Sequence, residues 1–143
     1  MFCKKKESEI NKATYIKVYT GFYLMEKWIK VRQRGKSLKQ FFEDNCIKEI
    51  AIYGMAEIGQ LLMLELKETS VNVKCGIDRN AKDKEHLGIK VVDFYDVEEY
   101  KDLPAIVVTP TQYFDDIRRQ LKEQTDAFII NLEDIVNYCI EEV

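Results

Sequence analysis

The spacing of hydrophobic residues along the chain changes near residue 46. Before it, hydrophobic side chains recur every three or four positions over residues 15–29, which is typical of a helix. After it, short apolar runs alternate with segments of helical spacing, which is typical of strands joined by helices in a parallel sheet. We therefore expect a helical extension at residues 1–45 and an α/β domain at residues 46–143.

The expected N-terminal helix carries two hydrophobic stripes. One consists of Tyr15, Val18, Tyr19, Phe22, Met25 and Ile29. The other consists of Leu24, Trp28 and Val31. Two stripes on one helix indicate two neighbours, which are either two parts of its own domain or its own domain and a partner protein. Gly35 is a typical helix stop, and a short helix through Phe41 and Phe42 completes an expected helical hairpin over residues 14–45.

Five apolar runs predict the strands of a sheet. In chain order they are residues 49–53, 71–78, 89–92, 105–108 and 128–130. Helices are expected after the first, third and fourth strands, and Asp96 is expected to cap the helix after the third. Residues 79–86 are expected to form a polar loop between the second and third strands, and a last helix is expected after Asn131 as its cap. Right-handed crossovers favour the strand order 3-2-1-4-5. The predicted fold class is α/β, a Rossmann-like parallel five-stranded sheet with an N-terminal helical hairpin.

The turn after the first predicted strand is the candidate ligand loop. Its residues are Gly54, Met55, Ala56, Glu57, Ile58 and Gly59. A strand before such a loop and a helix after it favour a phosphate site, because free N–H groups and the positive end of the helix dipole point at the ligand. Ala56 stands where a second glycine would let the backbone approach a pyrophosphate, so a turn that only preserves the fold stays an alternative.

Two charged residues end the second predicted strand. Asp78 follows Gly54 by 24 positions, near the place where such folds hold an acidic residue that binds a ribose diol, and this fits NAD better than NADP. Arg79 could instead meet a 2′-phosphate, so the choice of nucleotide stays open. The alternative is that Asp78 and Asn80 only form a turn.

Polar residues also follow the fourth predicted strand, which lies beside the first in the expected order. Thr109 and Pro110 should therefore line the far side of the same crevice, where a hydroxyl could contact a ribose or a sugar. Thr111 is expected to cap the next helix instead.

Candidates for catalysis or metal binding are few. His86 is the single histidine, and Tyr23 with Lys27 has the YxxxK spacing of short-chain dehydrogenases but precedes the glycine loop instead of following it. The four cysteines have no CxxC pair, so we expect reduced thiols and no zinc site. They are Cys3, Cys46, Cys75 and Cys139. We predict no catalytic residue and no metal ligand.

Composition and charge limit the class of protein. The 143 residues are 46% hydrophobic and 33% charged, as in ordinary globular proteins. No run approaches the ~18 apolar residues of a membrane span, and polar residues 7–12 argue against a signal peptide, so we expect a cytoplasmic protein. Residues 1–45 hold 11 Lys and Arg against 5 Asp and Glu, whereas the rest of the chain is acidic. This contrast suits docking of the extension on the domain or on a second copy, or alternatively a basic surface for an anionic partner. The acidic domain argues against nucleic acid as that partner.

Five segments, taken in order, resemble a known family. They read GKSL from residue 35, IAIYGMAEIG from 50, GIDRN from 76, IVVTP from 106 and NLEDI from 131. Together they resemble the small Rossmann-like NAD(P)- or nucleotide-sugar-binding domains of bacterial capsular and surface polysaccharide biosynthesis proteins. The resemblance implies an accessory protein of glycan synthesis that binds NAD(P) or a nucleotide sugar and has no catalysis of its own.

Two other functions stay open on the sequence alone. One is an NAD(P)-dependent enzyme of sugar-nucleotide metabolism, and the other is an interaction scaffold that binds no nucleotide. For each of them the aromatic residues of the first helix favour a homodimer, or docking on a larger glycan-synthesis protein, through residues 14–34.

Overall fold

A mostly parallel sheet forms the centre of the computed structural model, which describes residues 4–81 and 84–141, with side chains from residue 11 onward. The strands are β1 (Glu49–Tyr53), β2 (Asn72–Asp78), β3 (Glu85–His86), β4 (Ile89–Asp93), β5 (Ala105–Val108) and β6 (Phe128–Asn131). Their order in the sheet is β3-β4-β2-β1-β5-β6. All neighbouring pairs are parallel except β3 with β4.

The predicted mixed α/β class is confirmed, but the predicted number of strands is wrong. The additional strand is β3, in which Glu85 and His86 pair with the start of β4 through a turn at Gly88, where φ is +77°. Two residues in a polar loop have no hydrophobic alternation that could indicate a strand. Without this edge strand, the parallel strands follow the order β4-β2-β1-β5-β6.

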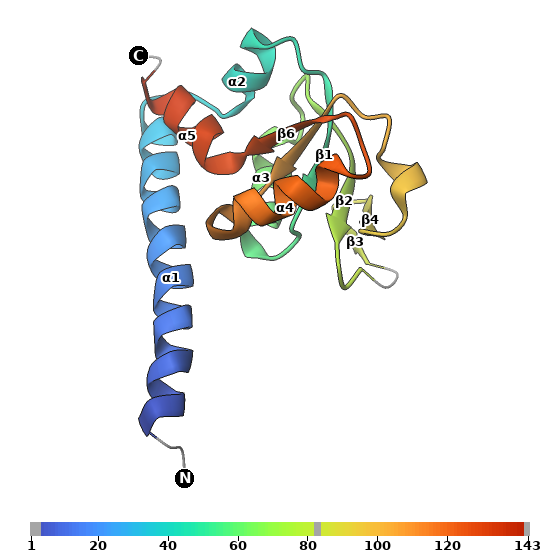
Figure 1. The fold of residues 1–143 in the computed structure, drawn as a ribbon. Helices are drawn as coiled ribbons and strands as arrows, with labels where there is room; N and C mark the ends of the chain where they lie inside the picture. The colour runs from blue at the N-terminus through green and yellow to red at the C-terminus, as the bar shows by residue number, and fades with distance from the viewer. Residues whose placement is uncertain (1–3, 82–83, 142–143) are drawn as a thin grey trace.

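Helices cover both faces of the sheet (Figure 1). They are α1 (Lys4–Gln33), α2 (Lys39–Asp44), α3 (Glu57–Leu66), α4 (Phe114–Lys122) and α5 (Leu132–Glu141), with 3-10 helices η1 (Val97–Glu99) and η2 (Thr111–Tyr113). The predicted cap of α5 is confirmed, since the Asn131 side chain accepts the N–H of Glu133 at 3.0 Å. The helix expected after Asp96 is wrong: only η1 forms there, because Tyr100 enters the core directly after it.

Side-chain alternation along the strands builds two cores. Ile50 and Ile52 face the layer of α1, α2, α3 and α5, whereas Ala51 and Tyr53 face the layer that contains α4. Burial of both faces explains why β1 and β5 read as continuous apolar runs. The carboxyl ends of the parallel strands β1 and β5 therefore meet at one edge of the sheet, between the two helix layers that cover its faces.

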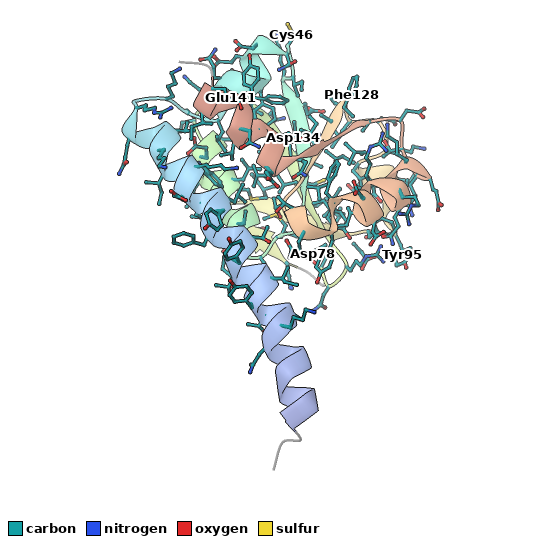
Figure 2. The ribbon with its side chains drawn as sticks, turned by 60° about the vertical axis from the view of Figure 1, so that its left-hand side comes forward. Cys46, Asp78, Tyr95, Phe128, Asp134 and Glu141 are labelled. Carbon is teal, nitrogen blue, oxygen red and sulfur yellow. The ribbon has the colours of Figure 1, made fainter. Side chains whose placement is uncertain are left out.

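The N-terminal helix differs from the predicted hairpin. α1 begins ten residues earlier than expected, because residues 4–13 are rich in the good helix formers Lys and Glu although they lack hydrophobic spacing. Leu24, Trp28 and Val31 pack into the core, while the N-terminal half of α1 extends past the rest of the molecule (Figures 1 and 2). The six-residue α2 packs against α5, so the segment is one long helix and a short helical turn.

Candidate functional site

A cavity of about 530 Å³ opens at the carboxyl ends of β1 and β5. The strand order reverses at β1, since its crossover to β2 leaves on one side and β5 lies on the other, and such a point leaves a crevice between the two loops. Gly54 with residues 56–58 forms one wall, and residues 109–113 form the second. The third wall is α1.

Two glycines shape the first wall. Gly54 has a φ of +93°, and a Cβ there would lie 2.6 Å from the Oγ1 of Thr109. A Cβ on Gly59 would lie 2.0 Å from the carbonyl oxygen of Gly54, so the first turn of α3 rests directly on the loop backbone. Both positions therefore need glycine, as the loop pattern predicted for a tight turn and close helix packing.

The start of α3 faces this cavity without a side-chain cap. Ala56 holds the N-cap position with extended geometry, φ −75° and ψ −159°, and makes no side-chain cap hydrogen bond. The N–H groups of the first turn, which begins at Glu57 and Ile58, therefore lie at the positive end of the helix dipole. The exposed Glu57 adds a negative charge to this wall, and Lys17 adds a positive charge from α1.

Met55 does not line the cavity, although it belongs to the predicted loop. Its side chain is 7% exposed and fills the space above Gly76 of β2, where a Cβ would lie 2.6 Å from the Cγ of Met55. The second residue of the loop therefore anchors the loop to the sheet.

Asp78 and Arg79 lie at the same edge but outside the cavity lining (Figure 2 labels Asp78). The carboxylate of Asp78 accepts the N–H of Met55 at 3.2 Å and the N–H of Asn80 at 3.2 Å. The contact to Asn80, two residues later, is the turn contact that the alternative role of Asp78 predicts, whereas the contact to Met55 joins β2 to the glycine loop.

The Arg79 side chain lies on the face of the sheet that α4 covers. Its guanidinium lies 4.3 Å from the centre of the Phe94 ring, and its Nε donates to the Tyr53 hydroxyl at 3.1 Å. A second donor contacts Gln120. Although burial opposes the charged form, interactions with Tyr53 and Tyr95 raise the pKa of Arg79 above its usual value. These contacts hold the guanidinium away from the cavity.

The second wall is held to the first by Thr109. This residue is 5% exposed, and its hydroxyl lies 2.7 Å from the carbonyl oxygen of Gly54 and 3.1 Å from that of Tyr53. Pro110 follows it on the wall. The expected capping role of Thr111 is wrong, because this residue begins η2 and α4 starts only at Phe114.

A family comparison covers most of this architecture. Residues 46–138 match the family described as C2185-like, N-terminal. The chain belongs to the C2185-like N-terminal family. Its matched region includes every strand of the sheet and both loop walls of the cavity, whereas α1 lies before it. No curated protein matches the chain.

The third wall of the cavity in this C2185-like chain was not predicted from the sequence. Lys17, Val18 and Gly21 of α1 line it, and a Cβ on Gly21 would lie 3.9 Å from the Cδ1 of Ile58. No local signal in the sequence marked this wall, because the approach of Ile58 to Gly21 is an ordinary van der Waals contact that a larger residue at position 21 would also allow. Gln112 and Tyr113 complete the lining on the η2 side.

The remaining candidate residues lie outside the cavity. Lys27 donates to Asn137 of α5 at 3.0 Å, and the Tyr23 hydroxyl accepts from the Tyr19 hydroxyl at 3.3 Å on the exposed face of α1. His86 has a buried Nε2 without a hydrogen-bond partner among the described residues. Over the same residues, no helix has the length and apolar character of a membrane crossing, and no three potential metal ligands cluster.

The described cysteines differ in reactivity. Cys46 is exposed, while Cys75 and Cys139 are buried, and Cys3 lies outside the described residues. Burial raises the pKa of Cys75 to about 11 and also raises the pKa of Cys139. Buried thiols of this kind are weak nucleophiles at neutral pH.

Proposed function

We propose that this protein is an accessory nucleotide- or nucleotide-sugar-binding module of bacterial surface polysaccharide biosynthesis, acting in the cytoplasm without catalysis of its own. Its five parallel strands and glycine loop suit a Rossmann-like unit, and its ordered sequence segments resemble the small domains of that pathway. The cavity between β1 and β5 carries the proposal, because it joins a helix start without a side-chain cap to a space of about 530 Å³.

The phosphate of the ligand is assigned to the first turn of α3. Ala56 leaves the N–H groups of that turn without a side-chain acceptor, and Lys17 supplies a cation on the facing wall. The sugar or base then extends along the largely apolar remainder, between Val18 and Tyr113. The residues that would contact the phosphate and those that would contact the sugar or base line the same cavity.

The ligand class follows from Asp78. In a dinucleotide site the acidic residue after the second strand binds the ribose diol. Here that carboxylate accepts two backbone N–H groups and lies outside the cavity lining, and Arg79 is engaged with Tyr53 and Phe94. This arrangement favours a nucleoside phosphate or nucleotide sugar over NAD(P), and with it a binding role over a hydride-transfer enzyme.

Thermal unfolding with a ligand panel tests the proposal. The panel contains UDP-sugars, nucleoside mono- and diphosphates, NAD, NADP and CoA. A ligand at one hundred times its Kd stabilises the folded protein by about 2.7 kcal/mol, which is an increase in Tm of several degrees for a chain of this size. We expect such a shift with a nucleotide sugar or nucleoside phosphate. No shift with any compound would leave the scaffold as the function.

A further inference from the structure

The exposed face of α1 is unusually apolar for a helix at a protein surface. It presents Tyr15, Val18, Tyr19, Phe22 and Ile29, each between 48% and 64% exposed. The aromatic rings contact one another along the helix, with Tyr15 stacked on Tyr19 at 5.4 Å and Tyr19 edge-on to Tyr23 at 4.6 Å. This face points away from the core, since Leu24, Trp28 and Val31 occupy the inward side of the same helix.

The apolar face continues onto α3. Leu61 and Leu64 of that helix are 40% and 53% exposed, and with Met25 and Ile29 of α1 they line a groove of about 810 Å³. Charged residues complete the lining of this groove, namely Arg32, Lys39, Glu65, Lys67 and Glu68. The surface therefore consists of a ridge, formed by Tyr15, Val18, Tyr19 and Phe22 of α1, and a groove beside the C-terminal half of α1. A ridge and a groove on one molecule are the two halves of a self-complementary contact.

Two pairs of apolar residues lie at equal distances on either side of Phe22 along α1. Tyr15 and Ile29 lie seven residues before and after Phe22, and Tyr19 and Met25 lie three before and after it. Two copies of the helix that run antiparallel and cross at Phe22 therefore pair Tyr15 with Ile29 at both ends. In that arrangement the part of α1 that extends past one molecule (Figure 1) reaches the groove of the other.

We infer that the protein forms a two-fold homodimer in which antiparallel α1 helices cross at Phe22 and each ridge fills the α1–α3 groove of the second copy. The apolar side chains of the ridge and groove, at 40% to 64% exposed, sum to roughly 700 Å² per copy if a large side chain presents ~150–250 Å² in full. A standard interface buries about 800 Å² per partner, so complete burial of these side chains would supply most of the area of such an interface. The inference does not depend on the nucleotide ligand.

Light scattering and sedimentation of the full chain test this assembly. We expect a particle of twice the 16.9 kDa chain mass that dissociates on dilution. Phe22→Glu should give a folded monomer, because two like charges meet at the axis. Phe128→Glu is the matched control: Phe128 is 74% exposed at the start of β6, away from α1 (Figure 2), and should stay dimeric. A wild-type monomer at high concentration, or an unchanged Phe22→Glu dimer, overturns the inference.

Cysteine cross-linking tests the direction of the helices. All variants carry Cys3→Ser and Cys46→Ser, which remove the thiol outside the described residues and the exposed one among the described thiols. Tyr15→Cys mixed with Ile29→Cys should form a disulfide-linked pair, whereas Tyr15→Cys alone should not. Self-linking of Tyr15→Cys would overturn the antiparallel arrangement. Wild-type protein that remains monomeric but binds vesicles of anionic phospholipid would assign the apolar face to a membrane surface instead of a second copy.

Discussion

The Oδ2 atom of Asp78 accepts the backbone N–H of Met55 at 3.2 Å. The contact joins the end of β2 to the glycine loop after β1, and it uses the acidic group that would otherwise bind a ribose diol. The Met55 side chain adds a second link, because it packs against Gly76 of the same strand. The loop is thus fixed to the sheet from one side, while its first helical turn faces the cavity.

Asp78→Ala tests whether this carboxylate is structural. The change leaves the N–H groups of Met55 and Asn80 without their acceptor, so the free energy of unfolding should fall by about 1–3 kcal/mol. Ligand affinity, measured by calorimetry below the lowered Tm, should change by less than threefold. A loss of affinity of tenfold or more with unchanged stability would return Asp78 to a ribose-binding role.

Ala56→Asp separates the fold from the site. Ala56 has N-cap geometry but no capping side chain, and Asp is a favoured N-cap residue, so the variant should be more stable by about 0.5–2 kcal/mol. Its carboxylate would compete with a phosphate for the same N–H groups and repel it, so affinity should fall at least tenfold. Ala56→Gly is the control, with affinity preserved or improved. Undiminished binding by Ala56→Asp would contradict the assigned phosphate position.

Two helical glycines should respond oppositely to alanine. A Cβ on Gly59 would lie 2.0 Å from a backbone oxygen, so Gly59→Ala should destabilise the protein by about 3 kcal/mol or more in chemical denaturation. A Cβ on Gly21 has only ordinary contact at 3.9 Å, so Gly21→Ala should stabilise by up to about 1 kcal/mol through helix propensity. Equal effects of the two substitutions would show that the loop does not pack on α3 as described.

Ionisation of the buried Tyr100 hydroxyl should destabilise the folded protein in alkali. Its hydroxyl donates within the core, and burial raises the pKa of Tyr100 from 10.0 to about 12. The folded state favours the protonated phenol, so the contribution of Tyr100 to the free energy of unfolding should not change with pH below about pH 10. Between pH 10 and 12 this contribution should fall by up to about 3 kcal/mol.

Tyr100→Phe isolates this contribution. The variant should be less stable at pH 7 by about 1–2 kcal/mol, because it loses the hydroxyl hydrogen bonds, but its stability should fall less steeply above pH 10. Tyr113→Phe, at a 59% exposed position, should keep the wild-type pH profile. Parallel pH profiles for wild type and Tyr100→Phe would contradict the raised pKa.

Local signals in the sequence predicted much of the fold. Continuous apolar runs at β1 and β5 indicated central strands, because both faces of these strands are covered. Asn131 and Gly35 marked helix ends, since a capping side chain and a positive φ are properties of single residues. The loop glycines were identified for the same reason.

Contacts between distant segments could not be predicted in this way. Nothing local to Asp78 indicates that its carboxylate binds Met55, and nothing in the spacing of Lys17 and Gly21 indicates that they wall the cavity. The two stripes of α1 were identifiable, but only the structure distinguishes the buried one, with Trp28, from the exposed one, with Phe22. Such assignments depend on how whole elements dock.

The position of the ligand is the central claim, and amide chemical shifts of ¹⁵N-labelled protein measure it most directly. On titration with the UDP-sugar or nucleoside phosphate that raises Tm most, the largest shifts should occur at the amides of residues 56–58, 111–113, 17, 18 and 21, which line the cavity. Amides of residues 78–80 should move little. Largest shifts at residues 78–80, or saturable binding without shifts at residues 56–58, would contradict the account.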